Sequence, residues 1–162
     1  MNLHFRNEII HGKNTTLIKV YIKEEKLKIK NMFTLEQIKA AHADVKSGAD
    51  FPRYMQKIIK LGVTGFETYT IDGHSVYYGK NGYKIESGAT YEDLKVAEQS
   101  NSKQFIHDLK ANQEGKTDFP TFCRDSAKSG VEKWVVDTDK MTCSYYDKAG
   151  NEMLVEKIPE HK

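Results

Sequence analysis

The stretch DFPRYMQKIIKLGVTGFETYTIDGHSVYYGKNG, residues 50–82, returns 68 positions later as DFPTFCRDSAKSGVEKWVVDTDKMTCSYYDKAG, residues 118–150. The two stretches align without a gap. Of the 33 aligned positions 11 are identical, where about two are expected from ordinary residue usage. Phe66 also meets Trp134, which keeps an aromatic ring at that position. We therefore expect an internal duplication.

Each copy of the repeat predicts the same order of elements, two helices followed by a three-stranded meander. In the first copy we expect Asp50 to cap a helix with Pro52 in its first turn, and Gly62 to mark the end of that helix. Alternating segments on both sides of Asp72-Gly73 predict a hairpin with a two-residue turn. We expect repeats over about 34–86 and 102–157, packed around a pseudo-twofold axis as one α+β domain that spans residues 32–162.

Helix signals are also present outside the aligned stretches. Thr34 is an N-cap type of residue, and Leu35, Ile38, Ala41 and Val45 recur at helical spacing up to Gly48. His42 is expected on the solvated side of this helix. Between the copies, residues 90–97 (TYEDLKVA) predict a short extra helix.

Residues 1–31 lie outside the repeat and form a basic N-terminal extension with a local charge of +4, so the remaining chain carries −2. Alternation in residues 17–22 (LIKVYI) and 27–30 (LKIK) predicts a short strand or hairpin. The alternative is translation from an upstream start, because Met32-Phe33-Thr34 suits a natural beginning.

The composition argues for a cytoplasmic globular protein without a membrane partner. Hydrophobic residues make up 38% and charged residues 30% of the 162-residue chain, and no apolar run approaches the roughly 20 residues of a membrane helix. The part that carries the repeat has no excess of Lys and Arg to neutralise phosphates, which argues against nucleic acid as a partner.

No catalytic or metal motif is present in the sequence. Cys123 and Cys143 lack Cys-x-x-Cys spacing and a nearby histidine pair, so small buried apolar residues are the simpler interpretation. Nucleophile-elbow, phosphate-loop and His-Glu-x-x-His patterns are also missing. We expect no metal and no cofactor, assign no catalytic residue, and favour a protein that is not an enzyme.

One group of side chains forms a candidate ligand-binding surface. Strand alternation brings Glu67, Tyr69, His74 and Tyr78 to one side of the predicted hairpin, away from the more apolar face. The simpler alternative is an ordinary half-exposed sheet face. His74 and Glu67 would lie about 13 Å apart along the strand, too far for a direct acid-base pair. The second copy lacks the Glu and the His, so any site is expected in the first copy or at the junction of the copies.

Several short motifs resemble those of a known family. They are MFTLEQI at residues 32–38, ADFP at 49–52, Gly62-Val63 and YTIDGH at 69–74. The chain resembles, over about residues 32–160, a family of small uncharacterised bacterial proteins often labelled "phage envelope protein". The resemblance implies a fold without an established activity, and it carries over no functional residue.

Three functional hypotheses remain open at this point. The first is a non-enzymatic binding or interaction module with an unknown protein or small-molecule partner, able to form a homodimer through an exposed edge strand. The second is a small-molecule binder or enzyme that uses the Glu67, Tyr69, His74 and Tyr78 surface. The third is a structural component derived from a phage.

Overall fold

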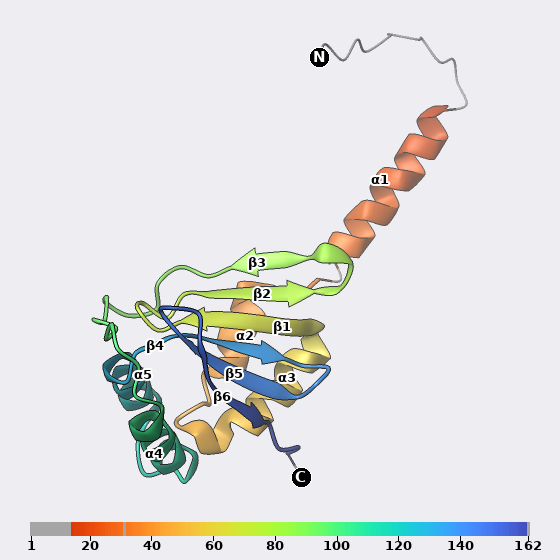
Figure 1. The fold of residues 1–162 in the computed structure, drawn as a ribbon. Coiled ribbons are helices and arrows are strands. Elements are labelled where there is room, and N and C mark those ends of the chain that lie inside the picture. Colours follow the sequence, from red (N-terminus) through yellow and green to blue (C-terminus); the bar gives the residue numbers. More distant parts are fainter. Residues whose placement is uncertain (1–13, 31, 162) are drawn as a thin grey trace, which may run out of the picture. The chain divides into compact units, whose positions relative to one another are not determined.

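The computed structural model describes residues 14–30 and 32–161 (Figure 1). Residues 1–13 of the predicted basic extension lie outside the described residues. The chain divides into two units, Met1–Met32 and Phe33–Lys162, and each is considered by itself. None of the described helices combines the length and the apolar character that crossing a bilayer requires.

The first unit contains helix α1, Asn14–Lys30. The prediction of a strand or hairpin here is wrong. Leu17 and Tyr21, like Ile18 and Ile22, are four residues apart and share a helical face, so the six-residue alternation fits a helix as well as a strand. Residues 15–28 of α1 are exposed.

The second unit has an α+β fold. In chain order its elements are α2 (Leu35–His42), the 3-10 turn η1 (Gly48–Asp50), α3 (Phe51–Leu61), β1 (Val63–Tyr69), β2 (Ser75–Gly79), the 3-10 turn η2 (Lys80–Gly82), β3 (Lys84–Glu86), α4 (Ser102–Gln113), α5 (Phe119–Lys128), β4 (Val131–Asp137), β5 (Thr142–Asp147) and β6 (Glu152–Lys157).

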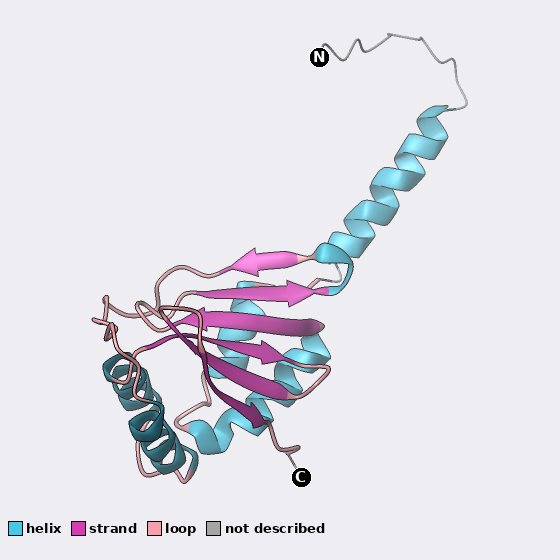
Figure 2. Cartoon of the chain, in the orientation of Figure 1, coloured by secondary structure: helices cyan, strands magenta, loops and turns pink. Residues whose placement is uncertain are grey.

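The six strands form one antiparallel sheet in the order β3-β2-β1-β4-β5-β6 (Figure 2). Strands β1 and β4 pair at its centre, where Glu67 lies opposite Val135. Helix α3 packs on Phe66 through Tyr54, and α5 packs on Trp134 through Phe122. Trp134 lies opposite Thr68, which is two positions from Phe66 on the same strand. Side chains two positions apart on a strand point to the same side, so Phe66 and Trp134 lie on one face of the sheet. The two helix pairs therefore cover one face.

The core lies between the helices and this face. Met55 and Ile58 of α3, Phe105 of α4 and Val131 of β4 are all buried there. The face assignment of the sequence is confirmed at Phe66, since this ring is buried in the same cluster while Glu67 and Tyr69 are on the other side.

The ends of two predicted helices are set by local signals. Thr34 Oγ1 accepts a hydrogen bond from the backbone N–H of Gln37, and Gln37 Oε1 accepts one from that of Thr34, which confirms Thr34 as the cap. Helix α2 nevertheless ends at His42, before Gly48. Gly62 ends α3 as predicted, with φ of 102°, a conformation that favours glycine.

Asp50 precedes α3 but does not cap it with its side chain. Its Oδ2 instead accepts hydrogen bonds from the backbone N–H groups of Lys46 and Ser47, at 2.9 and 3.3 Å. The carboxylate therefore stabilises the loop between α2 and α3.

Two predictions near the first hairpin are wrong. The N–H of Tyr69 donates to the carbonyl of His74, so four residues, 70–73, separate the paired positions instead of two. Residues 90–97 do not form a helix. Their backbone is held by the hairpin loop, since Thr90 N and Leu94 N donate to the carbonyls of Asp72 and Ile71 at 2.8 and 2.6 Å.

Candidate functional site

Three of the four residues predicted to bind a ligand form a row on the uncovered face of the sheet. The hydroxyl of Tyr69 donates to Glu67 Oε1 at 2.9 Å, and the Tyr69 ring stacks on His74 with centroids 4.5 Å apart. The hydrogen bond to Glu67, with burial, raises the pKa of Tyr69 to about 12. Lys133 Nζ lies 3.6 Å from Glu67 Oε2. Tyr69 thus stands between Glu67 and His74, consistent with the absence of a direct acid-base pair.

The fourth residue, Tyr78, lies opposite Gly65, whereas the predicted two-residue turn would place it opposite Glu67. Its pKa is raised by burial and then by the charge of Glu67, so it belongs to the same surface. His74 contacts Asp72 through Nδ1. Burial opposes ionisation of Asp72, yet the backbone N–H and the ring of His74 lower its pKa below the ordinary value. These groups bind one another, and a ligand role for them stays a prediction.

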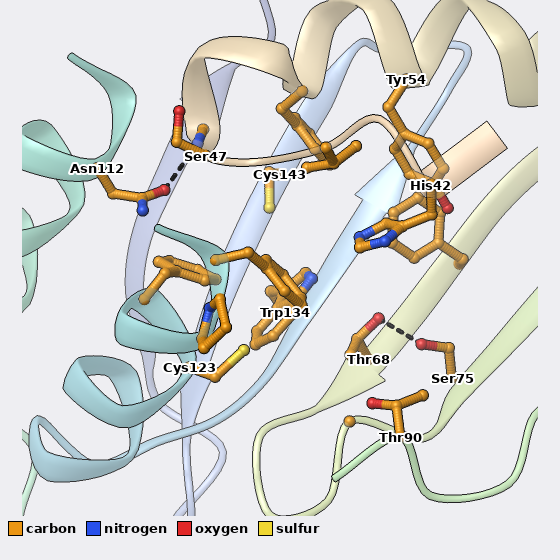
Figure 3. Close-up of a pocket in the computed structure, with 18 of the residues that line it drawn as sticks. His42, Ser47, Tyr54, Thr68, Ser75, Thr90, Asn112, Cys123, Trp134 and Cys143 are labelled. Atoms are coloured by element: carbon orange, nitrogen blue, oxygen red, sulfur yellow. Dashed lines mark hydrogen bonds between the residues drawn. The ribbon is translucent and has the colours of Figure 1, made fainter. Parts of the chain in front are cut away.

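A large cavity lies on the opposite, helix-covered face of the sheet (Figure 3). Its volume is about 1140 Å³, slightly above the roughly 300–1,000 Å³ typical of small-molecule sites. One wall comes from α2, η1 and α3, and the other comes from α4 and α5. Part of the loop between β3 and α4, including Thr90 and Tyr91, also lines it.

The floor of the cavity is built from the central strands. Strands β1 and β2 contribute four side chains, and β4 and β5 contribute three. They are Phe66, Thr68, Ser75, Tyr77, Trp134, Cys143 and Tyr145. Thr68 and Ser75 form a hydrogen bond of 2.6 Å between their hydroxyl oxygens, drawn in Figure 3. The floor is therefore mainly aromatic with one internally paired polar spot.

His42 is a wall residue that the sequence placed wrongly in solvent. It stands at the end of α2, is half-buried and lines the cavity. Its ring packs edge-on against Tyr54 at 5.2 Å and Phe119 at 5.0 Å between centroids. Burial lowers the pKa of His42, so the imidazole is neutral at physiological pH.

The two cysteines also line the cavity. Burial raises the pKa of the Cys123 thiol to about 11 and that of Cys143 to about 12. Both therefore stay protonated at neutral pH, whereas a nucleophilic cysteine needs a lowered pKa. The sequence interpretation of both as buried residues is confirmed.

Asn112 connects the two walls of the cavity. This α4 residue is only 3% exposed. Its Oδ1 accepts from the N–H of Gly48 at 2.8 Å, and its Nδ2 donates to the carbonyls of Thr117 and Asp118 at 2.9 and 3.0 Å. One amide thus links α4, η1 and the start of α5, which fixes the width of the cavity on this side (Figure 3).

Sequence reasoning did not find the cavity, although one signal pointed to it. Several lining residues come in pairs separated by the repeat offset, among them Phe51 and Phe119, Ser75 and Cys143, and Tyr77 and Tyr145. The cavity therefore lies between the two aligned stretches of the sequence. Their junction is one of the two places where the sequence analysis expected a site.

Comparison with known proteins gives a family but no activity. No match was found among curated proteins. The phage envelope label gains no support and stays a prediction. A family profile described as "Protein of unknown function (DUF1398)" matches residues 39–157, most of the chain. The chain belongs to this family of proteins of unknown function.

Proposed function

We propose that this protein is a non-enzymatic binding protein that holds a small organic molecule in the cavity between its helices and its sheet. The observation that carries the proposal is the cavity itself, about 1140 Å³ and lined mainly by apolar side chains, nine of them aromatic. Sites for small molecules are concave and mostly apolar with a few polar groups. The protonated thiols favour binding over nucleophilic chemistry, and the neutral His42 adds no charge to the lining.

We also propose that the fold arose by duplication and has a pseudo-twofold axis through its central strand pair. Glu67 lies opposite Val135, its own counterpart 68 positions later. Strands β1 and β4 share the same order of buried and half-buried residues, and their pairing shifts at matching positions, after Val63 and after Val131. These features support one ligand site on the axis, with one wall from each half.

The surface of Glu67, Tyr69, His74 and Tyr78 is a second candidate for contact with a partner. Its hydrogen bond and ring stacking hold the side chains in place without a ligand, which favours a preformed surface for another protein. A homodimer through an edge strand, β3 or β6, is a separate proposal, because an edge strand offers unpaired backbone groups to a second copy. On composition we place the protein in the cytoplasm.

The proposal is tested with N-phenyl-1-naphthylamine, an uncharged fluorescent probe of apolar sites. Ala43 is exposed at the end of α2 and lines the cavity, so Ala43→Phe places a ring at its rim without disturbing the core. Ala40 is exposed on the same helix and does not line the cavity, so Ala40→Phe is the matched control.

We expect saturable binding of the probe to the wild-type protein and to Ala40→Phe. Binding to Ala43→Phe should be at least about tenfold weaker, because a clash of roughly 1.4 kcal/mol suffices for that change. No saturable binding by the wild-type protein, or equal binding by the two variants, would contradict the proposal.

A further inference from the structure

We infer that the ligand of the cavity is an uncharged aromatic molecule with a carbonyl-type hydrogen-bond acceptor, which receives the indole N–H of Trp134. The inference rests on the proposed binding function and specifies its ligand class. Three independent features of the lining lead to it: an indole donor left free, a neutral interior and an arrangement of aromatic rings.

The first feature is the indole nitrogen of Trp134. The side chain is only 5% exposed and lines the cavity, yet Nε1 forms no hydrogen bond with any residue that the structure describes. Among residues 14–30 and 32–161, Thr70 Oγ1 is the one fully enclosed side-chain polar atom without a partner. Trp134 Nε1 also lacks a partner, so it cannot be fully enclosed by protein. The N–H of Trp134 therefore opens onto the cavity, as Figure 3 indicates for the indole.

A buried indole N–H usually has a partner, because an unsatisfied donor costs about 1–3 kcal/mol. Indole can donate but cannot accept, so the partner must be an acceptor. A carbonyl or similar oxygen on the ligand satisfies this donor. The neighbouring floor hydroxyls of Thr68 and Ser75 already bind each other, whereas the indole N–H of Trp134 has no partner among the described residues.

The second feature is the absence of charge from the described interior of the cavity. Lys39, Glu92, Arg124 and Lys157 line it but are exposed, and Glu156 is half-buried. Farther in, the polar side chains are hydroxyls, thiols, an amide and the His42 ring, which faces the cavity in Figure 3. A charged ligand would lose its hydration without gaining an ionic partner there, so the interior favours an uncharged molecule.

The third feature is the arrangement of the rings. Phe122 meets Trp134 at 5.3 Å between centroids, and His42 meets both Tyr54 and Phe119, all in edge-to-face geometry. Further rings on the lining come from Phe51, Phe66, Tyr77, Tyr91 and Tyr145. Aromatic rings prefer edge-to-face or offset neighbours, so a planar aromatic ligand gains contacts here that a flexible chain of equal area does not.

The test compares the affinities of two matched pairs of probes. N-phenyl-1-naphthylamine is titrated directly, and the other probes are measured by competition with it. The first pair compares this probe with 1-anilinonaphthalene-8-sulfonate, which adds a negative charge to the same ring system. The second pair compares 2-acetylnaphthalene with 2-isopropenylnaphthalene, in which a CH₂ group replaces the carbonyl oxygen at nearly constant shape. Trp134→Phe removes the N–H and keeps a ring, and Tyr146→Phe removes a hydroxyl from β5 that does not line the cavity.

We expect the uncharged probe to bind at least about tenfold more tightly than the sulfonate. The ketone should bind roughly two- to tenfold more tightly than the alkene, as one hydrogen bond predicts. Trp134→Phe should abolish this preference for the ketone, and Tyr146→Phe should keep it. Circular dichroism and thermal unfolding establish that both variants are folded.

The outcomes separate this inference from the proposed function. If the uncharged probe binds and Ala43→Phe blocks it, but the sulfonate binds as tightly, the uncharged class is wrong while the cavity remains a binding site. An equal affinity for ketone and alkene, or a ketone preference that survives Trp134→Phe, overturns the role of the indole. Failure of every probe to bind overturns both proposals.

Discussion

Replacing Asn112 with alanine should destabilise the protein by about 2–4 kcal/mol. Asn112→Ala leaves the N–H of Gly48 and the carbonyl of Thr117 without their partner, while the carbonyl of Asp118 still accepts from the N–H of Phe122. An unsatisfied buried group costs about 1–3 kcal/mol. The vacated space adjoins the cavity, so water can reach the freed groups in part, and the total stays below the sum of two full penalties.

Urea denaturation, followed by the fluorescence of Trp134, measures this loss directly, because the chain has a single Trp and it is 5% exposed when folded. Asn112→Asp keeps an acceptor for Gly48 but loses both donor contacts, so its loss should be intermediate. Lys110→Ala, an exposed position on the same helix, should stay within about 0.5 kcal/mol of wild type. A loss below about 1 kcal/mol in Asn112→Ala would refute the view that this amide holds the walls together.

Two further predictions concern the backbone and the pH dependence of stability. Gly73→Ala should cost about 2–4 kcal/mol of folding stability, because a Cβ there would lie 2.1 Å from Thr90 Oγ1 at a φ of 72°. Gly82→Ala, at a φ of 74° with no described atom within 4 Å, should cost about 1 kcal/mol. Equal losses of the two variants in urea denaturation would count against this. Asp147 accepts hydrogen bonds from the N–H groups of Asn151 and Ala149 and from the Ser100 hydroxyl, and these bonds lower its folded pKa below the ordinary value of 3.8. The ionised carboxylate therefore stabilises the fold fully above about pH 4, and this stabilisation is lost as the pH falls through the folded pKa. The stability gap between wild type and Asp147→Asn should therefore be larger at pH 7 than at pH 3, and a gap that is unchanged or wider at pH 3 would disprove the assignment.

Local signals in the sequence predicted local structure well. Thr34 and Gly62 mark helix ends through hydrogen bonds and backbone angles that involve only their own neighbours, so their roles could be predicted. The same holds for the buried face of β1 from Phe66 to Tyr69, where buried and half-buried residues alternate.

Features that depend on distant residues could not be predicted. The segment 90–97 has a helix-compatible sequence, but the carbonyls of Ile71 and Asp72 take its N–H groups, and nothing local indicates that. His42 was expected in solvent because the packing of Tyr54 and Phe119 around it depends on how two helix pairs meet. The cavity has the same origin, since the face that the sequence correctly identifies as apolar is only partly covered by helices.

The pairing of the strands has a consequence for the order of folding. Strands β1, β2 and β3 pair as sequence neighbours, and so do β4, β5 and β6, while β1 and β4 alone join the two sets among the described strands. Contacts between residues about 70 positions apart must first overcome the entropy of closing a long loop. We expect the two meanders to form early and the pairing of β1 with β4 to come last. Substitutions at Val136, on the seam between these two strands, should therefore change the folding rate little, which gives low φ-values in folding kinetics. The cavity, whose floor spans that seam, would then exist only after the final step of folding.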